Sequence, residues 1–177
     1  MMIDFDSEII DQCRRGEHKA QMQLYKTFYK RVYNTCYRVL HNQLEAEDVM
    51  QESFLKALSG LDNYNESIPF EAWLVRIAIN TSIDRLRKKE LDIITLNENI
   101  CYDISDTDDN EDWDNIITEV KRVKLAIEKL PESSRLIINL YLIEGYDHDE
   151  IAEILHIAPG TVRVQYMRAK QKLIELI

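Results

Sequence analysis

The stretch "GYDHDEIAEILHIAPGTVRVQYMRAK", Gly145–Lys170, has the pattern of two short helices joined by a tight turn. Asp147 is a good helix N-cap, and Glu150 three residues later completes a capping box. A turn is expected around His156, and Pro159 suits the first position of the next helix. The stretch therefore predicts a helix-turn-helix.

The second helix of this stretch has one apolar side and one basic side. Its apolar side is expected to face inward and consists of Val162, Tyr166, Ala169, Leu173 and Leu176. Its outward side consists of Thr161, Arg163, Val164, Met167, Arg168 and Lys170. Such a side suits the major groove, where arginines bind guanine or phosphate and apolar groups pack against thymine methyls. A helical hairpin with a solvated basic face is the alternative.

The composition favours an all-α protein, because the 177 residues include only four glycines and three prolines. No apolar run approaches the ~18 residues that a membrane span requires. The acidic N-terminus "MMIDFDSEII" lacks the layout of a signal peptide. We therefore expect a cytoplasmic protein without a membrane span.

Residues with catalytic or metal-binding chemistry form no recognisable motif. Cys13, Cys36 and Cys101 fit neither a disulfide framework nor a metal site, and reduced thiols are expected. The four histidines form no metal-binding pattern, and there is no glycine-rich phosphate loop. No catalytic residue, metal or cofactor is expected, and the protein is not expected to be an enzyme.

The net charge of −10 comes from one segment. Residues 91–120 carry ten Asp and Glu and no Lys or Arg, whereas residues 1–90 have a net charge of −1 and residues 121–177 of +1. This composition predicts an acidic flexible linker between two small helical domains, 1–90 and 121–177. The linker is either a solvated spacer or a polyanion that imitates nucleic acid in a partner's basic channel.

The stretch "LEAEDVMQESFLKALSGL" predicts a helix with apolar residues on one face. The opposite face carries Asp48, Glu52 and Leu55, with Gln51 at its border. The leucine among these outward carboxylates is either a side chain that is exposed by chance or part of a docking face. A docking face of this kind suits a partner whose surface has basic residues around an apolar spot.

The segment "PFEAWLVRIAINTSIDRLRKK" predicts a helix buried on two sides, with a narrow polar seam between them. Trp73 borders this seam, and basic groups gather toward the helix end; the candidate residues are Trp73, Arg76, Asn80, Arg85, Arg87 and Lys88. Cations and an aromatic ring along one groove suit a nucleic-acid strand. Cations stabilising a helix C-terminus are the alternative explanation of the basic end.

Taken together, these stretches resemble bacterial sigma factors of the extracytoplasmic-function (ECF) group over nearly the whole chain. "EAEDVMQESFLKAL" is similar to the helix that docks on the clamp coiled coil of RNA polymerase, and "FEAWLVRIAINTSIDRLRKK" to the helix that reads and helps to melt the −10 promoter element. "LPESSRLIINLYLIEGYDHDEIAEILHIAPGTVRVQYMRAKQKL" is similar to the domain that reads the −35 element. The loop "SGLDNYNESI" corresponds to the place where such proteins capture a flipped base.

The resemblance implies a factor that binds core RNA polymerase and directs promoter-specific initiation. Asp48, Gln51, Glu52 and Leu55 would contact the polymerase, and the two basic helices would contact the −10 and −35 elements. The implied partners are the clamp and flap of core polymerase, promoter DNA and an anti-sigma factor. The alternatives are a sigma mimic that titrates an anti-sigma factor, and a conventional helix-turn-helix regulator.

Four residues of the helix-turn-helix depart from the family pattern. Glycine is common at the turn position of His156, which requires either another conformation or a strained histidine. Serine or threonine is common at Ala158, so a helix cap is expected to be missing. A basic residue is frequent at Gln165, and Leu or Ile at Tyr166.

Overall fold

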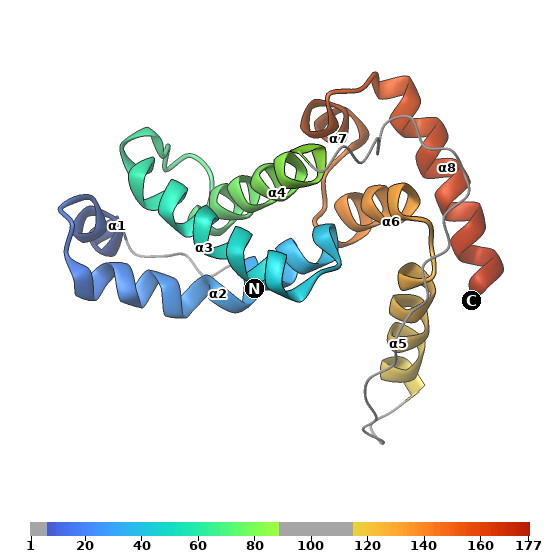
Figure 1. Ribbon diagram of the computed structural model, residues 1–177, viewed down its shortest axis with the longest axis horizontal. Helices are drawn as coiled ribbons and strands as arrows, with labels where there is room; N and C mark the ends of the chain where they lie inside the picture. Colours follow the sequence, from blue (N-terminus) through green and yellow to red (C-terminus); the bar gives the residue numbers. More distant parts are fainter. Residues whose placement is uncertain (1–6, 89–114) are drawn as a thin grey trace. The chain divides into compact units, whose positions relative to one another are not determined.

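The computed structural model describes the backbone of residues 7–88 and 115–177, with the side chains of 7–88 and 120–177. Every regular element in these ranges is helical (Figure 1), which confirms the all-α prediction. The described residues fall into two compact units. Residues 91–114 of the predicted linker and Cys101 lie outside the described residues.

The first unit is built on three long helices: α2 (His18–Leu40), α3 (Gln43–Ser59) and α4 (Phe70–Lys88). All three pack against one another, while the short α1 (Ser7–Arg14) lies on α2. Leu24, Val32, Val49, Leu74 and Ile79 are almost completely buried in this core. Burial of such side chains, worth roughly 1.5–3 kcal/mol each, outweighs the weak intrinsic preference of any one helix.

The turns of the first unit use local hydrogen bonds that the sequence supplies. Asn42 caps α3 by accepting a hydrogen bond from the backbone N–H of Glu45, at 3.1 Å. After α3, a short 3₁₀ turn, Leu61–Asn63, leads into the loop before α4. The guanidinium of Arg14 donates to the carbonyl of Leu61 at 3.3 Å, so α1 holds this loop in place.

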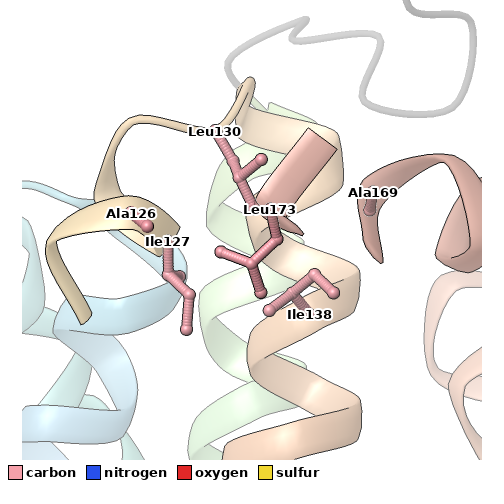
Figure 2. Packing of buried hydrophobic residues seen from close by; sticks show 6 residues of the cluster. All are labelled: Ala126, Ile127, Leu130, Ile138, Ala169 and Leu173. Carbon is pink, nitrogen blue, oxygen red and sulfur yellow. The ribbon is translucent and has the colours of Figure 1, made fainter. Parts of the chain in front are cut away.

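The second unit contains α5 (Asn115–Glu128), α6 (Glu132–Ile138), α7 (His148–Leu155) and α8 (Pro159–Leu176). A π-helical turn, Asn139–Ile143, continues α6. Figure 2 shows side chains of α5, α6 and α8 and of the turn after α5 meeting in one apolar cluster, which consists of Ala126, Ile127, Leu130, Ile138, Ala169 and Leu173. The capping box of Asp147 and Glu150 and the N-terminal position of Pro159 are as predicted.

Two sequence-based details of the second unit differ in the structure. α5 begins at Asn115, inside the range expected to be linker, because apolar residues at helical spacing (Ile116, Val120, Val123 and Ile127) already start there. Leu176 was expected to face inward but is 45% exposed. The buried side of α8 ends at Leu173, and the final turn extends beyond the apolar cluster.

Candidate functional site

The outer face of α3 lies at the surface, as the helical period predicted. Asp48 and Gln51 are exposed, and Leu55 is 68% exposed. Leu44, which was not among the residues predicted for this face, is 74% exposed. Its position four residues before Asp48 would have placed it on the same face. The face thus has an acidic and amide centre with an exposed leucine toward each end.

Glu52, at the edge of this face, is bound by cations of its own domain. Its carboxylate lies 2.9 Å from Nζ of Lys56 and 3.4 Å from Nη2 of Arg85 on α4. Lys56 is also 3.2 Å from the hydroxyl of Thr81, on α4. The hydrogen bond from Lys56 lowers the pKa of Glu52 from its ordinary value of 4.5, partial burial opposes this, and Arg85 adds to the lowering. The structure therefore joins a predicted polymerase-contacting residue to a predicted DNA-contacting one.

The polar seam of α4 is also exposed over most of its length. Arg76, Asn80 and Lys88 lie at the surface, while Arg85 and Arg87 are half-buried. Nη1 of Arg87 lies 3.5 Å from the carboxylate of Asp84, one turn earlier. The seam therefore presents cations and the amide of Asn80 along one side of the helix. Its carboxylate, that of Asp84, lies beside Arg87.

Trp73 is held at the N-terminal end of this seam by two aromatic neighbours. Its ring centroid lies 5.1 Å from that of Tyr64 and 5.5 Å from that of Phe70. Tyr64 is buried, and its hydroxyl donates to the carbonyl of Ile68 at 2.7 Å. The half-buried indole is thus a preorganised surface rather than a mobile side chain. Capture of a flipped base by the adjoining loop stays a prediction.

The turn between α7 and α8 uses a histidine where a glycine would be free of strain. His156 adopts the left-handed conformation, with φ 54° and ψ 44°, which is uncommon outside glycine although histidine tolerates it better than most residues. Its N–H bonds back to the carbonyls of Ala152 and Glu153. Ala158 precedes α8 in an extended conformation and supplies no side-chain cap. The missing cap is confirmed, and of the two conformations considered for His156 the strained one is observed.

The outward side of α8 has the arrangement that its sequence predicted. The opposite side of the helix is packed on α6 and α7. All six residues predicted for the outward side are exposed: Thr161, Arg163, Val164, Met167, Arg168 and Lys170. Val164 and Met167 remain 52% and 64% exposed. Exposed aliphatic groups between cations suit thymine methyls beside guanine or phosphate. Arg163 donates from Nη2 to the carboxylate of Asp149 on α7, at 3.2 Å.

Tyr166, at a position where the resemblance implied Leu or Ile, completes an aromatic cluster. Its ring lies 4.4 Å from Tyr141 in the π-helical turn and 5.0 Å from His148 at the start of α7. Tyr141 and His148 stack at 4.8 Å. Burial, and to a lesser degree proximity to Tyr141, raises the pKa of the Tyr166 phenol. This cluster connects α8 to both preceding elements behind the outward face.

Family models match both units of the chain. The model described as sigma-70 region 2 matches residues 24–91, and that described as sigma-70, region 4 matches residues 121–173. The ECF RNA polymerase sigma factor SigW of Bacillus subtilis is 33% identical over 93% of this chain and 92% of its own. The RNA polymerase sigma-H factor of Pseudomonas aeruginosa is 28% identical over 95% and 91%.

Solved structures agree with this assignment. CnrH, solved in complex with the cytosolic domain of CnrY, has a TM-score of 0.55 and 25% identity over 97% of this chain and 96% of its own. The sigma factor RpoE of Bartonella quintana, solved with the anti-sigma factor NepR, shares the fold with a TM-score of 0.59 and 21% identity, over 88% and 94%. No described helix is long and apolar enough to cross a bilayer. With both region models matched in order and a full-length ECF relative at 33% identity, the chain belongs to the RNA polymerase sigma factors of the ECF group, which direct transcription initiation.

Proposed function

We propose that this chain binds core RNA polymerase through α3 and directs it to promoters with two elements. Asp48, Gln51, Glu52 and Leu55 contact the polymerase clamp, with Leu44 extending the same face. The −10 element is bound, and strand opening assisted, by the exposed seam of α4 and its basic end: Trp73, Arg76, Asn80, Arg85, Arg87 and Lys88. The −35 element is bound by the outward side of α8, which consists of Thr161, Arg163, Val164, Met167, Arg168 and Lys170. The C-terminal unit also contacts the polymerase flap. The polymerase supplies the catalysis and the metal.

One observation carries this proposal: the chain presents two separate exposed cationic helix faces, one in each unit, together with an acidic and leucine-bearing face on α3. A two-part DNA site needs two reading surfaces, because each single helix covers only a few base pairs. A mimic that only titrates an anti-sigma factor has no need of exposed arginines such as Arg76 and Arg163. A conventional regulator has no need of the α3 face.

Two further parts of the proposal follow from the family. Since CnrH was solved bound to the cytosolic domain of CnrY, and the sigma factor RpoE of Bartonella quintana to the anti-sigma factor NepR, we propose that an anti-sigma protein binds this chain and holds it inactive. We also propose that the chain acts in the cytoplasm as a binding factor without enzymatic activity of its own. The domains that carry these roles are residues 1–90 and the C-terminal unit that starts with α5.

The direct test is reconstitution of the full chain with core polymerase from the same organism, followed by mapping of transcription starts on genomic DNA. The expected result is a small set of new starts that share two upstream sequence elements. Core polymerase alone is the baseline, and the variant Arg76→Ala with Asn80→Ala is the matched control for the −10 surface. Stable binding to polymerase without any specific start would contradict the proposal and favour the mimic.

A further inference from the structure

The ion pair between Asp149 and Arg163 joins the two helices of the helix-turn-helix. Asp149 lies in the first turn of α7, and Arg163 lies on the outward face of α8. Nη2 of Arg163 lies 3.2 Å from Oδ1 of Asp149, with 60% and 68% of the two side chains exposed. The candidate groove-facing arginine is therefore held on one side by a carboxylate that faces the same solvent.

The carboxylate is presented by a rigid part of the unit. The backbone N–H of Asp149 donates to Oδ1 of Asp147 at 2.8 Å. The N–H of Asp147 in turn donates to Oε2 of Glu150 at 2.9 Å, which closes the capping box. α7 is fixed to α8 by buried side chains, among them Ile151 and Val162, both 0% exposed. The packed helices thus fix the separation of the two backbone positions, and the ion pair between the exposed side chains then favours one orientation of Arg163.

A single bond to Asp149 leaves the arginine competent to read a base. A guanidinium has five N–H donors, and the pair uses one of them. Bidentate recognition of guanine O6 and N7 needs two donors. An unrestrained arginine side chain loses much rotamer entropy when it is fixed on a base, whereas one that is already oriented loses less.

We propose that Asp149 is a specificity-determining positioning residue for the upstream promoter element. It holds Arg163 so that the remaining donors meet one guanine in the major groove. This inference rests on the proposed function, since it assumes that the outward face of α8 enters the groove.

The charge of Asp149 gives the proposal a distinctive signature. The first helix of a helix-turn-helix crosses the DNA backbone, so a carboxylate at its start repels phosphates. Removal of this charge raises the affinity for DNA of any sequence and at the same time lowers the preference for guanine. A residue with only a structural role lowers both quantities together.

The experiment uses reconstituted holoenzyme and a promoter whose upstream element carries each of the four bases at every position. Affinity is measured at one fixed salt concentration for the wild type, Asp149→Asn, Asp149→Ala, Arg163→Ala and the double variant Asp149→Ala with Arg163→Ala. Asp149→Asn keeps the side-chain shape if the alanine variant folds poorly. Glu175→Gln, at an exposed position near the end of α8, removes the same charge elsewhere.

In the wild type we expect guanine to be preferred at one position by about 5- to 150-fold, the range of a bidentate arginine–guanine pair. The Asp149 variants lower that preference by about two- to fivefold, the range of an exposed ion pair. They also raise the affinity for unrelated DNA. Once Arg163 is alanine, Asp149→Ala produces no further change in base preference.

An unchanged guanine preference in both Asp149 variants would overturn the inference. So would an equal effect of Asp149→Ala with and without Arg163, because the two side chains would then act independently. Absence of any promoter-specific initiation by the wild-type holoenzyme is a different result, which contradicts the proposed function itself.

Discussion

Glu52 on α3 and Arg85 on α4 form an ion pair of 3.4 Å that links the face proposed for the polymerase to the helix proposed for the −10 element. The same carboxylate accepts a hydrogen bond from Lys56 at 2.9 Å. A substitution at Glu52 therefore alters two surfaces at once, whereas Asp48 is exposed one turn away on the outer face. This relationship decides which variants test each surface separately.

Asp48→Lys is expected to weaken the binding of core polymerase about tenfold, because it reverses a charge on a face that meets a basic partner. The unfolding temperature of the variant stays within the error of the wild type, since Asp48 is exposed. Binding is measured by titration of labelled core enzyme. Asp62→Lys, which changes an exposed carboxylate in the 3₁₀ turn of the same unit, is the charge-matched control. Equal affinities of the Asp48 variant and the wild type would remove α3 from the interface.

Glu52→Gln tests the pH dependence that the lowered pKa of Glu52 implies. A carboxyl group whose pKa is lower in the folded protein stabilises the fold above its unfolded value, here near 4.5, and this stabilisation is lost as pH falls through the folded value. The wild type is therefore expected to be more stable than Glu52→Gln near neutral pH, and the two are expected to converge as the pH falls below 4.5 and through the lower pKa of the folded state. Urea unfolding at several pH values measures the difference, and a constant difference at every pH would contradict the assignment.

Arg168→Ala is expected to lower the affinity of the holoenzyme for the upstream element by about 1–3 kcal/mol if the side chain contacts a base edge. If Arg168 contacts a phosphate instead, the loss is uniform across sequences and the salt dependence of binding falls by about one unit of slope. Both are measured on promoter DNA at several salt concentrations. Lys124→Ala, an exposed cation on α5, removes the same charge away from α8. Identical losses in the two variants would exclude a specific role for Arg168.

Ala158→Thr is expected to stabilise the start of α8 by about 1 kcal/mol, because the hydroxyl supplies the N-cap acceptor that is missing here. Ala158→Val has the same shape without the hydroxyl and is expected to give no such gain. Hydrogen exchange of the α8 amides in the full chain reports on this helix separately from the first unit. A similar gain in both variants would mean that shape, not capping, is responsible.

The elements and faces that depend on neighbouring residues could be predicted from the sequence. Apolar residues at helical spacing predicted one buried face for α3, on which Val49 and Phe54 lie, and an opposite face that carries the exposed Leu55. The capping box of Asp147 and Glu150 and the helix start at Pro159 were predicted because both act through local hydrogen bonds and fixed backbone angles. The linker was predicted to reach residue 120, past the start of α5 at Asn115, since strong acidity concealed the apolar period of that helix.

The contacts between helices could not be predicted, because they depend on how side chains far apart in the sequence pack together. Periodicity placed Glu52 and Arg85 on surfaces but did not show that they meet across α3 and α4. Likewise it placed Tyr166 on the inner side of α8, while its contacts with Tyr141 and His148 arise from the packing of α8 against α7 and the π-helical turn.

For this protein, the sequence alone determined that the chain is helical, that its faces are amphipathic, and which side chains face outward, because these properties repeat with the 3.6-residue period of the helix. Only the tertiary structure decided that Asp149 holds Arg163 and that Glu52 is shared between two surfaces. Those pairings require a carboxylate and a guanidinium on different helices to approach within about 4 Å, the limit for an ion pair. That approach is set by the packing of the buried sides of the helices.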